Sequence, residues 1–289
     1  WVNDGGDWND TIHWSYISGG QGGANIPTPI DNVIFDINSF SLPAQVVNVN
    51  VSNALCHDMN WIGVQLNPRL YGNNNTNLHL FGSLLLDTNM DFGFKGKVYF
   101  EAITSGQTIS CSGKVFKDHV YFDGVGGKWK LLDEIMVNKS LYIKNGSIFT
   151  NSQNVHCNRF YLTANSNIDS IIINSTVTVE DYFRSEGNAF YNFSDSHIIM
   201  ISDQATFDDS HLWGSVEYNR VTFTSQLKAQ SWYRNYPAIE GMTKFKSVVF
   251  LENGRLSYCE FDTLTFSPGG LYRVYDCVIN DAFILNGNC

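Results

Sequence analysis

One short pattern recurs five times in the middle of this 289-residue chain. Each copy centres on a tyrosine with apolar neighbours, and the tyrosines are Tyr99, Tyr121, Tyr142, Tyr161 and Tyr182. Subtracting the residue numbers gives spacings of 22, 21, 19 and 21. A period near twenty, in a sequence rich in β-formers and turn residues, is typical of a solenoid. Each coil of a solenoid must stack on its neighbours to bury its apolar face.

Two further sets of apolar residues recur with the same period, so each repeat contains more than one strand. Their spacings are 20, 19 and 23 in the first set and 20, 20 and 22 in the second. The sets are Ile109, Trp129, Ile148 and Ile171, and Val115, Ile135, Val155 and Val177. Short strands separated by Gly, Asn, Asp and Ser predict an all-β parallel β-helix with coils of about 21 residues, because Gly and Asn tolerate the left-handed corners. A β-sandwich also has short strands, but it gives no reason for columns to recur in register.

Residues 1–36 lack the repeat and are expected to cap the solenoid, whereas residues 37–289 form the β-helix, all within one domain. The first segment carries three tryptophans, Trp1, Trp8 and Trp14. A solenoid needs such a cover because its first coil otherwise leaves an open strand edge and an uncovered core. A platform on which sugar rings stack is the alternative role for the three indole rings.

Charge and hydropathy argue against two kinds of partner. The net charge is -10, and phosphate binding needs a basic face, so we expect no nucleic acid and no anionic membrane surface. No apolar run is long enough to span a bilayer, so we expect no membrane insertion. The sequence opens at Trp1 without a methionine, which suits a mature secreted protein or a fragment.

Six cysteines are present, and none lies in a Cys-x-x-Cys pair that would indicate zinc or a thioredoxin-like motif. In an exported protein an even number favours disulfides. The candidates are Cys259, Cys277 and Cys289, because the 18 residues between the first two are about one coil and would bring them close together. Cys111 and Cys157 are explained equally well as small buried residues of the core.

Three acidic residues near the start are candidates for a structural calcium site. They are Asp4, Asp7 and Asp10. Calcium needs several converging oxygen ligands, and carboxylates are the ligands that it prefers, although this spacing is not that of an EF-hand loop. We expect no other cofactor.

Several longer stretches are specific as a set. They are GDWNDTIHWS, IPTPIDNVIFD, CHDMNW, YFEAITSGQTISCSGKVF, YFDGVGGKWKLLD, SLYIKNGSIFTNSQNV and FDTLTFSPGGLYRV. Together they resemble the β-helical N-terminal regions of large, adhesin-like surface proteins of Bacteroidota, many of which carry type IX secretion signals at a distant C-terminus. The resemblance covers nearly the whole chain. It implies a right-handed parallel β-helix at the cell surface, associated with the outer membrane, and it implies no enzyme.

The sequence departs from this pattern at residues 226–243, where the spacing between Val221 and Val248 stretches to 27. Extra residues within one coil predict an inserted loop, and loops on a rigid scaffold are common recognition sites. We therefore expect contacts with a glycan or a partner chain from four residues of this segment, Trp232, Tyr233, Arg234 and Tyr236. A loop that merely covers one flank of the solenoid is the alternative.

The tyrosines of the repeat are the second candidate surface. Side chains alternate along a strand, so a tyrosine whose neighbours fill the core points outward. We expect Tyr99, Tyr121, Tyr142 and Tyr161 to stack as one exposed aromatic column. Mutual packing on a solvated face is its simplest role, and a flat platform for a glycan or a partner protein is the sharper one.

Catalytic residues are not evident. Polysaccharide lyases need a base beside a uronate, and hydrolases need paired carboxylates. Asp208 and Asp209 are adjacent, but neighbours on a strand point to opposite faces. A loop placement is equally compatible with this pair.

We therefore expect a non-enzymatic extracellular β-helix that forms part of an adhesin or a cell-surface filament, with adhesion, gliding or surface attachment as its role. Its partners are a glycan or protein at a cell surface, and further domains of the same chain or neighbouring subunits, because the last residues form an ordinary coil without a cover. The alternatives are a β-helical polysaccharide lyase or hydrolase and a carbohydrate-binding module. About eleven or twelve coils are expected after Val46.

Overall fold

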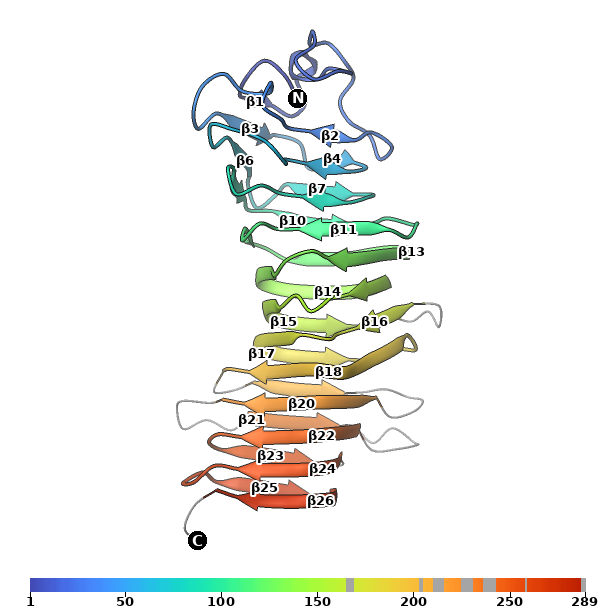
Figure 1. Cartoon of the computed structure of the whole chain (residues 1–289), viewed down its shortest axis with the longest axis vertical. Helices are drawn as coiled ribbons and strands as arrows, with labels where there is room; N and C mark the ends of the chain where they lie inside the picture. Colours follow the sequence, from blue (N-terminus) through green and yellow to red (C-terminus); the bar gives the residue numbers. More distant parts are fainter. Residues whose placement is uncertain are drawn as a thin grey trace. The chain divides into compact units, whose positions relative to one another are not determined.

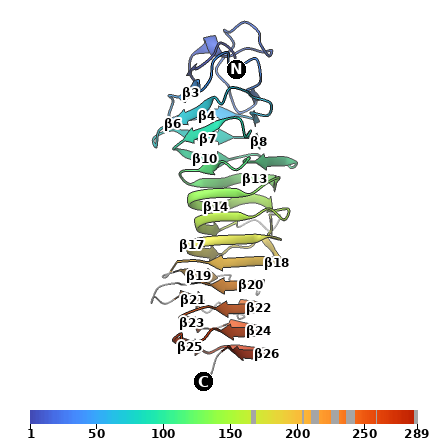
Figure 2. The ribbon, with the colours of Figure 1, turned by 60° about the vertical axis from the view of Figure 1, so that its left-hand side comes forward.

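The computed structural model describes residues 1–164, 169–202, 205–209, 216–224, 231–235, 243–257 and 259–286. The described chain is all-β and forms a parallel β-solenoid of about 10 turns, with coils of about 22 residues. The strands of successive coils lie side by side in both ribbon views (Figures 1 and 2). The turns are fewer than the sequence predicts because several coils are longer than expected, and the coil between Val221 and Val248 has 27 residues.

The chain divides into two compact units, Trp1–Lys139 and Ser140–Cys289. The sequence predicts a single domain, because the repeat pattern continues through this point without a change of composition. In a solenoid each coil contacts only its neighbours, so the pattern of one coil carries no signal for where a boundary falls.

The first unit contains short strands, three to a coil, and one 3-10 helix. One wall has the strand order β1–β3–β6–β9, and β4–β7–β10–β13 forms another. The elements are β1 (Gly6–Asp7), η1 (Thr11–His13), β2 (Val33–Ile34), β3 (Val46–Val49), β4 (Asn53–Cys56), β5 (Met59–Asn60), β6 (Arg69–Gly72), β7 (Asn77–Leu80), β8 (Leu84–Leu85), β9 (Asp91–Phe94), β10 (Lys97–Phe100), β11 (Gln107–Ser110), β12 (Val115–Phe116) and β13 (Val120–Leu131). Strand β14 (Ile135–Phe149) contains the boundary between the units.

The second unit has longer strands that pair with different neighbours along their length. The N-terminal half of β17 pairs with β18, and its C-terminal half pairs with β19, always in parallel. The strands are β15 (Val155–Leu162), β16 (Ser170–Ile172), β17 (Thr176–Ser185), β18 (Phe190–Met200), β19 (Thr206–Asp209), β20 (Glu217–Phe223), β21 (Ser231–Asn235), β22 (Thr243–Phe250), β23 (Gly254–Ser257), β24 (Cys259–Phe266), β25 (Tyr272–Tyr275) and β26 (Val278–Leu285).

The tyrosine repeat sets the register that the sequence predicts where β10 pairs with β13. Tyr99 lies opposite Tyr121, and Phe100 lies opposite Phe122. The tyrosines are half-buried, whereas the phenylalanines are fully buried. The strand therefore alternates between a core face and an outer face, as its sequence pattern requires.

Two predicted registers are wrong by one residue. Val115 pairs with Met136, one residue beyond the expected partner, because that coil is longer than the spacing assumed for it. Tyr182 lies opposite Arg159 rather than Tyr161, because the register between β15 and β17 shifts just before Arg159. A bulge adds a residue to one strand, and a repeat count alone does not reveal it.

The core consists of columns of buried apolar side chains. Phe100 and Phe122 stack with their ring centroids 4.7 Å apart in the first unit. Phe183 and Phe207 stack at 4.5 Å in the second. Neighbouring strands lie about 4.8 Å apart, so identical aromatic residues on successive coils stack without any backbone adjustment.

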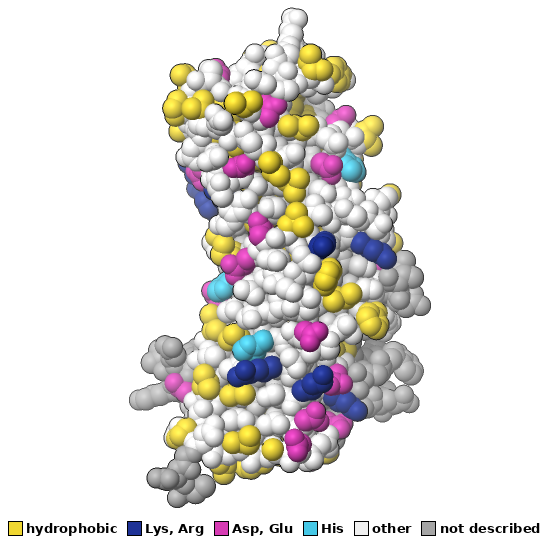
Figure 3. Space-filling model, in the orientation of Figure 1, with side chains coloured by type: hydrophobic (Ala, Val, Ile, Leu, Met, Phe, Trp, Pro, Cys, Tyr) yellow, Lys and Arg dark blue, Asp and Glu magenta, His cyan; other side chains and the backbone are white. Residues whose placement is uncertain are grey.

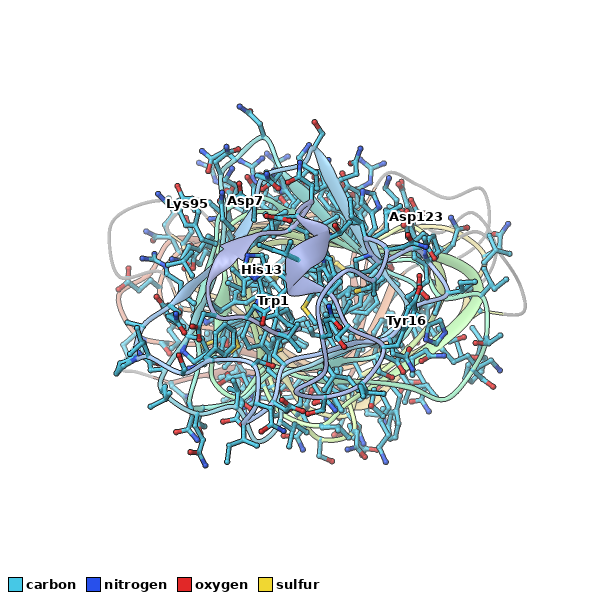
Figure 4. The ribbon with its side chains drawn as sticks, turned by 90° about the horizontal axis from the view of Figure 1, so that it is seen from above. Trp1, Asp7, His13, Tyr16, Lys95 and Asp123 are labelled. Carbon is cyan, nitrogen blue, oxygen red and sulfur yellow. The ribbon has the colours of Figure 1, made fainter. Side chains whose placement is uncertain are left out.

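The N-terminal segment places its tryptophans inside, over the first coils. Trp8 is fully buried, and Trp1 and Trp14 are nearly so. Trp1 stacks on His13 with centroids 4.8 Å apart, and Figure 4 shows both residues near the middle of the view from above. Because β1 pairs with β3 and β2 pairs with β5, this segment covers the first strand edge. Rings buried in this way leave no platform for sugar stacking.

Candidate functional site

Aromatic rings stack on the outer face of the first unit. The ring of Tyr99 lies between those of His79 and Tyr121, with centroid distances of 4.6 and 4.7 Å. His79 Nδ1 lies 2.8 Å from a carboxylate oxygen of Glu101 and holds the imidazole in place. Burial and the negative charge of Glu101 raise the pKa of Tyr99, so this phenol keeps its proton.

A second stack lies on the outer face of the second unit. Tyr142 stacks on Tyr161 with centroids 4.7 Å apart, and Tyr182 follows at 5.6 Å with its ring tilted. The tyrosines of both stacks are half-buried rather than fully exposed, because each ring covers the faces of its neighbours. Only the ring edges and hydroxyl groups are therefore offered to a partner.

The insertion predicted at residues 226–243 contributes a strand to the wall of the second unit. Residues 231–235 form β21, which pairs with β19 and β23 in parallel. Trp232, Tyr233 and Arg234 lie on this strand, opposite Thr206, Phe207 and Asp208 of β19. The inserted-loop interpretation is therefore wrong for residues 231–235. Tyr236 and the segments 225–230 and 236–242 lie outside the described residues.

The three aspartates proposed for calcium point to three different partners. Asp4 accepts hydrogen bonds from the backbone N–H and the hydroxyl of Ser41. Asp7 accepts one from the Asn48 amide at 2.6 Å, and Asp10 caps η1. Within the described ranges, no group of three or more His, Cys, Asp or Glu side chains is arranged to hold a metal ion.

The adjacent acids of β19 have opposite orientations, as strand geometry requires. Asp208 accepts a hydrogen bond from the Tyr182 hydroxyl at 2.6 Å. Asp209 accepts one from the Thr243 hydroxyl at 2.7 Å. Both residues are buried, and they contact different strands. The two carboxylates therefore do not flank one substrate in the way that a hydrolase requires.

An open groove on the second unit gathers charges that the sequence did not predict as a site. It is lined by Glu217, Lys244, Phe245, Glu260, Asp262 and Asn280. Glu217 and Glu260 lie opposite Lys244 on the neighbouring strands, and Lys244 Nζ is 3.6 Å from a Glu260 oxygen. Figure 3 shows acidic and basic side chains close together on the part of the face where Figure 1 draws β20 to β26.

The last described coil leaves an apolar edge uncovered. Ile279, Phe283 and Leu285 of β26 are 38%, 51% and 51% exposed. Their register partners on β24 are Phe261, Leu264 and Phe266, which are all buried. Thus residues at core positions of the repeat face solvent on this coil, and β26 pairs only with β24 among the described strands.

The cysteines of the described chain are free thiols. Cys56, Cys111 and Cys157 are fully buried, which agrees with their interpretation as small core residues. The predicted disulfide is not formed, although the Sγ atoms of Cys259 and Cys277 lie 3.7 Å apart. Cys289 lies outside the described residues.

Comparisons with protein-family models, with curated protein sequences and with solved structures find no match. In the part of the chain that the structure describes, no helix has the length and apolar character needed to cross a membrane. The functional argument therefore rests on the surfaces described above.

Proposed function

We propose that this chain is a non-catalytic β-solenoid of a cell-surface adhesin or filament. Its apolar C-terminal edge stacks against a further β-coil, in the same chain or in a neighbouring subunit. Its aromatic stacks contact a glycan or protein at the cell surface. An extracellular location, export by type IX secretion and origin in Bacteroidota belong to this proposal through the sequence resemblance.

The exposed apolar edge carries the proposal. In the coils before it, the matching positions are buried by the next coil, and burial of such side chains stabilises a solenoid by about 1.5–3 kcal/mol each. A free secreted enzyme gains nothing from leaving them in water. A protein that assembles coil upon coil needs an edge of this kind.

The edge is tested by changing its charge. The double variant Phe283→Lys/Leu285→Lys places cations on the uncovered core positions. The control Ile284→Lys changes the residue between them, whose register partner Thr265 is half-buried on the outer face of β24. Sedimentation of the wild type should show concentration-dependent association, because two open edges can pair about a two-fold axis. The double variant should be monomeric, and the control should associate like the wild type.

Association that persists in the double variant, or a wild type that stays monomeric up to its solubility limit, counts against the proposed edge. Circular dichroism of all three proteins shows whether the fold is kept. The surface role is tested separately on a glycan array and on intact cells, with Tyr142→Ala/Tyr161→Ala as the variant. That variant should lose binding while it retains the melting temperature of the solenoid within a few degrees.

The groove at Lys244 favours a second candidate function, a polysaccharide-active enzyme. A lysine is a suitable base for abstracting a proton next to a uronate. Its three acidic neighbours, Glu217, Glu260 and Asp262, oppose the approach of an anionic sugar, so we rank this function second. Incubation with a panel of anionic and neutral polysaccharides decides it: new reducing ends or unsaturated uronates that disappear in Lys244→Ala would establish the enzyme.

A further inference from the structure

We propose that Cys259 and Cys277 are a redox-active pair that closes into an intrachain disulfide when the protein meets a small disulfide oxidant such as oxidised glutathione. The structure shows the reduced state, in which the two Sγ atoms are in contact at 3.7 Å without a bond. The proposal stands independently of the cell-surface function, because it depends only on two thiols one coil apart.

The strand register brings the two cysteines together. Cys259 begins β24, and Cys277 directly precedes β26. They come one residue before the register pair Glu260 and Val278. Neighbouring strands lie about 4.8 Å apart, which is within the Cα separation of about 4.4–6.8 Å that a disulfide spans. Closing the bond therefore requires rotation of the side chains and no movement of the backbone.

The two thiols differ in exposure and in acidity. Cys259 is fully buried, and burial raises its pKa well above the ordinary range, so it keeps its proton. Cys277 is half-buried, and the hydrogen bond from Cys259 lowers its pKa to about 7 against the opposing effect of burial. Cys277 is therefore an accessible thiolate near neutral pH, whereas Cys259 is shielded from any external reagent.

This asymmetry sets the order of reaction. The Cys277 thiolate attacks one sulfur of oxidised glutathione, the S–S bond of the oxidant breaks, and one glutathione thiolate leaves. Cys259 then loses its proton and attacks the Cys277 sulfur of the mixed disulfide, and the second glutathione leaves. Two protein thiols are oxidised by two electrons, and the oxidant is reduced to two glutathione molecules, which take up the two protons.

Closure ties the last described coil to the coil before it. The bond joins residues 18 positions apart and spans the whole of β25. A loop of this length lowers the chain entropy of the open state by about 3 kcal/mol, so local opening of β25 and β26 should be about a hundredfold rarer in the oxidised protein. The same coil carries the apolar edge with Phe283 and Leu285. Oxidation therefore stabilises that surface in its ordered form.

The test is peptide mapping by mass spectrometry of the full chain after incubation with oxidised glutathione. The wild type should yield a Cys259–Cys277 cross-link. Cys259→Ser should stop at a persistent glutathione adduct on Cys277, and Cys277→Ser should leave Cys259 unreacted. The control Cys157→Ser, which removes another buried thiol, should behave like the wild type. Alkylation of Cys277 by iodoacetamide should reach half its maximal rate near pH 7.

Three outcomes overturn the proposal: both thiols remain reduced in the wild type, Cys277 remains glutathionylated, or Cys277 cross-links to Cys289 instead. The wild-type result decides even where a serine variant fails to fold, which circular dichroism reveals. None of these outcomes bears on the association of the apolar edge, which is measured in reduced protein.

Discussion

Replacement of Phe100 and of Tyr99 by alanine tests the division of β10 into a core face and an outer face. Phe100 is fully buried and stacks on Phe122, so Phe100→Ala should lower the free energy of opening by about 3–5 kcal/mol. Tyr99 is half-buried between His79 and Tyr121. Two partly solvated ring contacts are worth about 1–2 kcal/mol in total, so Tyr99→Ala should cost only that amount.

Native-state hydrogen exchange of the β10 amides is the suitable assay, because a solenoid opens locally rather than in one step. The difference of about 2–3 kcal/mol predicts amide opening at least ~25-fold more frequent in Phe100→Ala than in Tyr99→Ala. Exchange in β24 and β26 serves as the internal control, because those strands lie in the other unit. Equal losses for the two variants, or a larger loss for Tyr99→Ala, would refute the assignment of the two faces.

Two smaller predictions concern the first unit. Gly124→Ala should destabilise the solenoid by about 1–3 kcal/mol in urea denaturation, because an added Cβ would collide with the carbonyl oxygen of Ala102 on the preceding coil. Hydrogen bonds from Ser41, first from its backbone N–H, lower the pKa of Asp4. The stability that Asp4 contributes is therefore present above its unfolded pKa of about 3.9 and is lost as the pH falls through its lower folded value. In a pH series of thermal melts, Asp4→Asn should flatten this acid dependence, and an unchanged pH profile would contradict the role of Asp4 in the cap.

The sequence predicts the solenoid because its strongest signal, the tyrosine triplet, repeats in every coil that it covers. The stretch of 27 residues from Val221 to Val248 is also recovered as a register pair. A count of residues fails where the chain adds one without changing the pattern. The bulge before Arg159 moves Tyr182 out of its expected partnership for this reason.

The candidate sites were less accessible to sequence reasoning. The groove residues Glu217, Lys244 and Glu260 are 27 and 16 residues apart, so no single period aligns them. Only the pairing of β20, β22 and β24 brings them together. The search for oppositely charged residues at the spacings of neighbouring apolar column members would have found this set. The separation of 18 residues between Cys259 and Cys277 did indicate their proximity, but the difference in their burial required the structure.

The central claim is that the C-terminal edge stacks against another β-coil. Hydrogen exchange of the β26 amides in reduced protein, measured at low and at high protein concentration, tests it most directly. The account predicts that the outward backbone groups of β26 exchange quickly in the dilute protein and become protected as the protein associates. It also predicts no such protection in Phe283→Lys/Leu285→Lys. Exchange of β26 that is the same at both concentrations, or protection that appears instead at the tyrosine stacks of β10 and β15, would contradict the claim.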